Sequence, residues 1–133
     1  MHVLSSLIGL LLLMGAASAN AEPGVRDVPV RVASVGKIIE DGSAAMVRVA
    51  TVCPRGWGVL ESFVYLVQDG NQSFEGFFTP SCDGARHAYK VRVEAVDFTF
   101  HQGEATASAY ILLMGPGGQE RQGQDYRTVT LHT

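Results

Sequence analysis

Apolar and polar side chains alternate with a period of two through much of this chain, and no stretch shows the 3.6-residue period of an amphipathic helix. The alternation is cleanest between positions 87 and 95. There the apolar side chains are Tyr89, Val91, Val93 and Ala95, and the charged ones between them are Lys90, Arg92 and Glu94. A period of two is that of a β-strand with one buried and one solvated face. The chain is therefore predicted to be all-β.

Turn-forming residues separate the alternating stretches. Asp-Gly pairs and segments rich in Gly and Pro lie at 41–42, 54–58, 69–72, 80–84 and 115–118. Seven or eight short antiparallel strands between such turns are the pattern of an immunoglobulin-like β-sandwich. Closure of the strands into a small barrel is the alternative. We expect the sandwich to occupy 35–133, preceded at 22–34 by a leader and an edge strand, because Pro29 cannot donate to a strand ladder.

The first 21 residues differ from the rest of the chain, since they contain no Asp, Glu, Lys or Arg. A run of apolar and small residues extends to Ala19 and is centred on four consecutive leucines. Small-x-small sequences end at Ala19 and at Ala21, as signal peptidase requires. The run is shorter than the roughly 20 apolar residues of a spanning helix. We therefore predict a cleaved signal peptide at 1–21, secretion, and no stable membrane insertion after cleavage.

The chain has two cysteines, Cys53 and Cys82, and both follow the predicted signal peptide. In an oxidising compartment an even number of cysteines indicates a disulfide, and here one pairing exists. Closing a loop of this length stabilises a fold by about 3–4 kcal/mol on the chain-entropy model. We expect this bond to support a domain whose core does most of the folding.

The sequence lacks the residue patterns of several chemistries. The formal net charge of −3 indicates no basic footprint for nucleic acid or for an anionic membrane. No Gly-x-Ser-x-Gly motif occurs, and the histidines have no paired metal-ligand spacing. His87 lies four residues after Asp83, and we expect it to hydrogen-bond that turn. No catalytic residue, metal site or cofactor is therefore predicted.

The aromatic residues suggest a binding surface. Trp57 lies in a loop between two glycines, and Phe98 lies in a segment of poor alternation. Phe77 is adjacent to Phe78, so one of the two should point away from the core of a sheet. Exposed aromatic rings at Trp57, Phe77 and Phe98 would suit a glycan, an apolar ligand or a protein outside the cell. The alternative is that these rings pack in the core, with Trp57 covering the disulfide.

The order of motifs resembles a family of small exported proteins, mainly from actinobacteria, that has no assigned function. The resemblance covers roughly 35–131, from Asp41-Gly42 through Gly56-Trp57-Gly58 to Gly103 and the alanines of the following strand. Its most specific part is Cys82-Asp83-Gly84 followed by His87, an aromatic residue and Val91. The family tends to have Trp where this chain has Tyr89. The resemblance implies a disulfide-bridged sandwich and export, and it implies no activity.

These observations favour an exported, non-enzymatic binding or interaction module. The alternative is a structural or envelope-associated domain without a small-molecule ligand. A hydrolase is the third class, and it is disfavoured because the recognisable catalytic constellations are missing.

Overall fold

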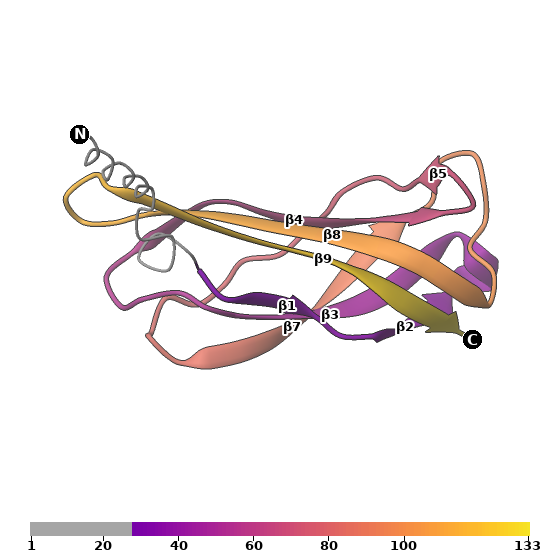
Figure 1. Ribbon diagram of the computed structural model, residues 1–133, viewed down its shortest axis with the longest axis horizontal. Helices are drawn as coiled ribbons and strands as arrows, with labels where there is room; N and C mark the ends of the chain where they lie inside the picture. Colours follow the sequence, from indigo (N-terminus) through magenta and orange to yellow (C-terminus); the bar gives the residue numbers. More distant parts are fainter. Residues whose placement is uncertain (1–27) are drawn as a thin grey trace, which may run out of the picture.

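The computed structural model describes residues 28–133, and nearly all of their regular structure is β-strand (Figure 1). The predicted signal peptide and the start of the leader lie outside these residues. The strands are β1 (Val30–Val32), β2 (Val35–Ile39), β3 (Ala44–Val52), β4 (Gly58–Gln68), β5 (Asn71–Gln72), β6 (Gly76–Phe77), β7 (Arg86–Glu94), β8 (Gly103–Met114) and β9 (Glu120–His132). A 3-10 turn, η3 (Glu40–Gly42), joins β2 to β3. Among the described residues, no helix has the length and hydrophobicity to cross a membrane.

The strands form the two layers of the predicted sandwich. In one, the β3 layer, β3 pairs with β7 along one edge and with β1 and β2 along the other. In the second, the β8 layer, β8 lies between β4 and β9, while β5 and β6 pair with β4. Figure 1 shows β4, β8 and β9 running together above β1, β3 and β7. The all-β sandwich is thus confirmed.

Two details differ from the sequence-based expectation of seven or eight antiparallel strands. Residues 28–133 form nine strands, because the two-residue β5 lies within the segment at 69–72 that the sequence indicates as a turn. In addition, β2 pairs with β9 in parallel, from Val35 opposite Thr130 to Lys37 opposite His132. The chain from β1 to β2 continues along one edge of β3 and then joins the β8 layer. That long-range pairing has no local sequence signal.

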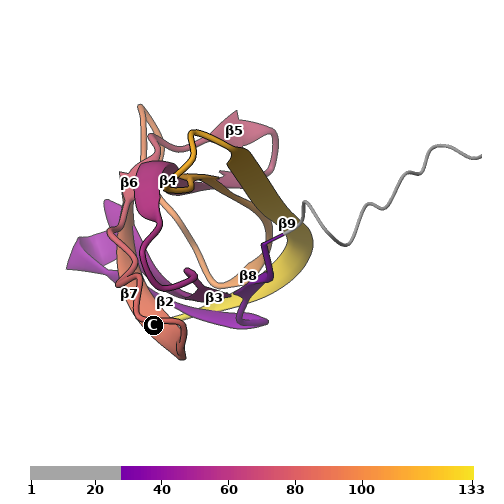
Figure 2. The same ribbon diagram turned by 90° about the vertical axis from the view of Figure 1, so that its left-hand side faces the viewer.

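The core lies between the layers and is built from the inward side chains of every long strand. Val47, Val49 and Thr51 on β3 and Cys53 just after it are all buried. Alanines at 105, 107 and 109 on β8 leave room for larger residues opposite. In Figure 2, where the strands are seen nearly end-on, both layers surround this shared core. Each fully buried Val or Leu contributes about 1.5–3 kcal/mol relative to exposure, so the inward residues supply the main driving force.

Candidate functional site

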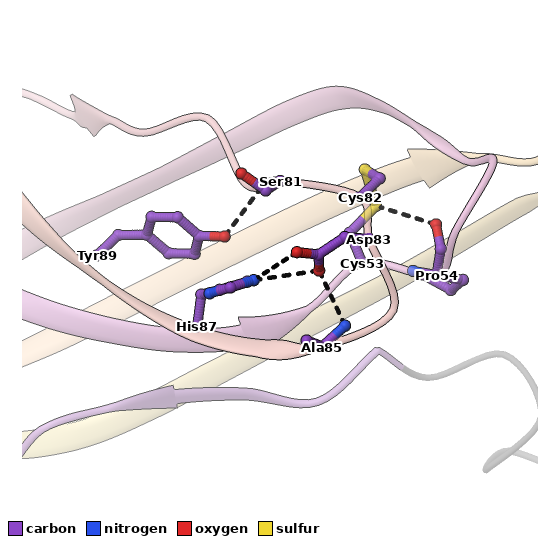
Figure 3. Close-up of a disulfide and its surroundings, with 8 residues drawn as sticks. All are labelled: Cys53, Pro54, Ser81, Cys82, Asp83, Ala85, His87 and Tyr89. Carbon is purple, nitrogen blue, oxygen red and sulfur yellow. Dashed lines mark hydrogen bonds and ion pairs between the residues drawn. A yellow bond between two sulfur atoms is a disulfide. The ribbon is translucent and has the colours of Figure 1, made fainter.

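The disulfide lies just after the end of β3 (Figure 3). Cys53 follows β3, Cys82 lies in the segment before β7, and their sulfur atoms are 2.08 Å apart. Their Cα atoms are 4.4 Å apart, within the range for a disulfide. The amide of Gly84 donates to the carbonyl of Cys53 at 2.9 Å. The predicted pairing is confirmed, and it anchors the connection from the β8 layer to β7.

Asp83 and His87 form a polar cluster beside the disulfide (Figure 3). The Ala85 amide donates to Asp83 Oδ1 at 2.9 Å, and His87 Nε2 lies 2.9 Å from Asp83 Oδ2. These two hydrogen bonds, the Ala85 amide first, hold the pKa of Asp83 below its ordinary value. His87 therefore braces its own turn, as the sequence predicts. Across residues 28–133, no group of three or more His, Cys, Asp or Glu side chains is placed to hold a metal ion.

The three aromatic residues singled out from the sequence belong to three different clusters. Trp57 is half-buried against a small core around Cys53, and the Arg121 guanidinium lies 4.9 Å from its ring centroid. Phe98 is half-buried on the main core and contacts Phe100 edge-on, with ring centroids 5.1 Å apart. Phe77 is 71% exposed. Of these three side chains, Phe77 is the one that is mostly available to a partner.

Phe77 and its neighbour point to opposite sides of the β8 layer. Phe78 is 9% exposed and belongs to the main core, whereas Phe77 faces outward. This arrangement is the one expected for two adjacent residues in an extended segment. The prediction that one ring of this pair leaves the core is confirmed.

The outer surface of the β8 layer carries a larger set of rings, which we call the aromatic face. Phe63 on β4 pairs with Phe77 on β6 and with Tyr110 on β8, with ring centroids 6.4 and 5.6 Å away. In a neighbouring row of the same sheet, Ser108 pairs with Tyr65 on β4 and with Tyr126 on β9. The aromatic face consists of Phe63, Tyr65, Phe77, Tyr110 and Tyr126.

A shallow hollow of about 370 Å³ lies within the aromatic face. Its lining is Phe63, Tyr65, Ser108, Ala109, Tyr110, Gln124, Asp125 and Tyr126. The Tyr110 hydroxyl donates to Gln122 Oε1 at 3.0 Å, which fixes the position of that ring. Tyr126 is 73% exposed at the rim. The hollow is within the size range of small-ligand sites, and it combines rings with a few polar groups as those sites do.

Sequence reasoning missed four of the five rings in the aromatic face. A signal was present, because Phe63 and Tyr65 alternate with the inward Val64 and Leu66 and therefore had to point outward. The alternation does not say which strands are neighbours. The face exists because β6, β4, β8 and β9 are consecutive in space.

The outer surface of the β3 layer has a different chemistry, and we call it the basic face. It carries Arg31, Lys37, Arg48, Arg86 and Lys90, all exposed. Arg92, on the same strand as Lys90, instead pairs with Glu40 at 2.5 Å and with Glu94 at 3.0 Å. These hydrogen bonds raise the pKa of Arg92, and the bond to Arg92 lowers the pKa of Glu40. The net charge of the chain does not reveal that positive side chains gather on one face.

Comparisons with known proteins add little to this geometry. No family model matches the chain, and no curated protein matches its sequence. The resemblance to exported actinobacterial proteins therefore stays a prediction. Among solved structures, the crystal structure of Spo0M, a sporulation control protein from Bacillus subtilis, matches with 15% identity and a TM-score of 0.40. The match covers 80% of this chain and 50% of that one, so this chain spans about half of its length.

Proposed function

We propose that this protein is an exported, non-enzymatic module that binds a neutral glycan chain on its aromatic face. The observation that carries the proposal is the gathering of five rings from four neighbouring strands on a solvent-facing sheet surface. Monomeric proteins rarely leave large apolar patches exposed, and such patches commonly mark binding sites. The disulfide is compatible with an oxidising compartment outside the cytosol.

The polar groups of the hollow favour a neutral ligand. Ser108, Gln124 and the tyrosine hydroxyls can each donate to and accept from a sugar hydroxyl. No Lys or Arg lines the hollow. Asp125, its one acidic residue, accepts instead from the Val32 amide at 2.8 Å and from Arg127 Nε at 3.0 Å. A charged ligand would therefore find no partner of opposite sign that is free to bind it.

The shape of the aromatic face suits an extended chain. Phe77, Phe63 and Tyr110 form one row across three strands, and neighbouring strands are about 4.8 Å apart. The faces of sugar rings are lined by C–H groups, which pack well against aromatic rings. A row of this length can contact more than one sugar unit. The open surface also lets the rest of a polymer continue past the site.

Native affinity electrophoresis tests the proposal, with dissolved β-glucan, xylan or galactomannan in the gel. At least one polysaccharide should retard the wild-type protein, and Phe77→Ser and Tyr126→Ser should each weaken the affinity about tenfold or more, as loss of a stacking ring does. Phe74→Ser is the matched control, because Phe74 is a 57% exposed phenylalanine that is not part of the aromatic face. It should leave the retardation unchanged.

Two results would overturn this proposal. One is a wild-type protein that none of the three polysaccharides retards. The other is a stable dimer in light scattering that Tyr126→Ser converts to a monomer, since the aromatic face would then be an interface between copies of this chain.

A further inference from the structure

A second hollow, of about 260 Å³, is lined mainly by residues of β1, β3 and β7 and also by Arg127 of β9. Four arginines line it, namely Arg31, Arg48, Arg86 and Arg127. Small side chains, including Ala33, Ala50 and Ala88, form the rest of its outer lining. We call it the arginine hollow. The alanines leave space above the sheet that longer side chains would fill.

Strand register explains how the arginines surround this space. Ala50 on β3 lies between Arg31 on β1 and Ala88 on β7, in one row across three strands. Arg48 precedes Ala50 by two residues, and Arg86 precedes Ala88 by two residues. Because β3 and β7 are antiparallel, these two arginines lie at opposite ends of the alanine floor. Arg31, Arg48 and Arg86 therefore line the hollow from three different strand positions around the alanines.

The positive charge of the hollow is poorly compensated. The Asp125 carboxylate accepts from Arg127 Nε at 3.0 Å, and the charge of Arg31 also acts on it, so these two arginines are partly neutralised. Arg31, Arg48 and Arg86 have no ion-pair partner within residues 28–133. Arg92, by contrast, has two carboxylate partners on the same sheet surface. Like charges held close together repel one another, and a bound anion would relieve that repulsion.

We infer that the arginine hollow binds a phosphate group. A guanidinium presents a planar fork of N–H donors that matches the oxygens of phosphate, and several such forks can share one phosphate. A carboxylate has two oxygens and one charge, so it would satisfy fewer of these donors. This site lies on the β3 layer, and it is independent of the glycan proposed for the aromatic face.

The phosphate could belong to a soluble molecule or to a lipid headgroup, and the neighbouring surface makes both worth testing. Another hollow, of about 610 Å³, adjoins the arginine hollow and shares Arg48 with it. It combines apolar Val35, Ile39 and Met46 with the basic Lys37 and Lys90. Apolar residues ringed by basic ones are what the interface of an anionic bilayer contacts. The shared chemistry is the phosphate itself.

Two binding measurements with the wild-type protein separate these sources. Inorganic phosphate is titrated into ¹⁵N-labelled protein and followed by NMR, with sodium chloride as the ionic-strength control. Vesicles of phosphatidic acid in phosphatidylcholine, and of phosphatidylcholine alone, are used for co-sedimentation. We expect saturable shifts of the Ala50 and Ala88 amides with phosphate. Phosphatidic acid vesicles that also sediment the protein, while phosphatidylcholine vesicles do not, would assign the phosphate to a headgroup.

Substitutions test whether the arginine hollow is the site that binds phosphate. Arg48→Gln and Arg86→Gln should each weaken binding about tenfold, and Arg48→Lys should recover only part of it, since lysine keeps the charge but lacks the fork. Arg55→Gln, which removes one exposed charge from the loop beside the disulfide, is the control and should bind like the wild type. The three side chains changed, Arg48, Arg55 and Arg86, are all exposed on the surface, so circular dichroism should show the native fold for every variant.

The inference is wrong if two results occur together. The Ala50 and Ala88 amide shifts are the same with chloride as with phosphate, and phosphatidic acid vesicles sediment no more protein than phosphatidylcholine vesicles do. It is equally wrong if Arg55→Gln weakens binding as much as Arg86→Gln, because the interaction would then follow net charge and not the arginine hollow.

Discussion

The two outer faces of this sandwich follow the same strand geometry and carry opposite chemistry. The aromatic face of the β8 layer has five rings and no lysine or arginine in its hollow. The basic face of the β3 layer has exposed arginines and lysines around a floor of alanines. Both layers bury the same kinds of aliphatic residue between them. Inward positions therefore specify the fold, and outward positions of the same strands are free to specify function.

The sharpest test of this division compares adjacent residues on β4. Leu66 is fully buried in the main core, and Tyr65 lies on the aromatic face. Leu66→Ala should lower the free energy of unfolding by about 4 kcal/mol, because it removes buried atoms and leaves a cavity. Tyr65→Ser should cost about 1 kcal/mol or less, as solvent-facing changes usually do. Urea denaturation measures both, and similar losses would mean that the aromatic face is part of the structural core.

The disulfide between Cys53 and Cys82 anchors the connection between the layers. Replacing Cys53 and Cys82 together by serine should lower the free energy of unfolding by about 3 kcal/mol, because the unfolded chain gains loop entropy. The denaturation midpoint of the variant, compared with that of the wild type, measures the loss. Non-reducing mass spectrometry of the wild type is the control. Two alkylatable thiols in the native protein would contradict the bond on which this prediction depends.

Substitution of Trp57 tests whether the aromatic face extends as far as the disulfide. The ring is half-buried beside Cys53 under Arg121, and a Cβ at Gly115 would lie 2.8 Å from it. We therefore expect Trp57→Ala to lower the free energy of unfolding by about 2 kcal/mol, less than a fully buried tryptophan would. It should leave glycan retardation unchanged. An unaltered denaturation midpoint together with lost retardation would place Trp57 in the binding surface instead.

Particular residues show what the sequence could predict. The alternation predicted the inward face of β7, and the Phe77–Phe78 pair split between core and surface as expected. Pairing of the two cysteines needed only the even count. The alternation and the Phe77–Phe78 prediction were confirmed because they depend on residues close in sequence. The disulfide was confirmed because two cysteines allow only one pairing.

The two candidate sites depend on the order of the strands in each layer, which the sequence pattern does not predict. Phe63 and Tyr126 face the same way in one sheet only because β8 pairs with both of their strands. Arg31, Arg48 and Arg86 line one hollow because β3 lies between β1 and β7. Such pairings are fixed by tertiary packing. Alternation within a single strand therefore predicts which of its residues point outward. It does not predict which outward residues from different strands share a face.

The smallest expected effect comes from an exposed pair on the crossover from the β3 layer to the β8 layer. His101, between β7 and β8, has Nε2 2.5 Å from Asp69 Oδ2, in the turn after β4. Its Nδ1 lies 2.9 Å from the Gln102 carbonyl oxygen. With an acceptor at each ring nitrogen, the protonated imidazolium can donate twice. The hydrogen bond to Asp69, followed by the one to Gln102, raises the pKa of His101.

The raised pKa fixes the sign of a pH dependence. The folded state favours charged His101, so its stabilisation is complete below the ordinary histidine pKa of about 6.5 and is lost as pH rises through the higher folded-state pKa. The Tm of the wild type should exceed that of His101→Gln at low pH, and the difference should shrink above that range. Asp69→Asn should show the same convergence, because asparagine tolerates the positive φ of 52° at this position. A Tm difference that stays constant with pH would show that His101 stabilises this crossover by packing alone.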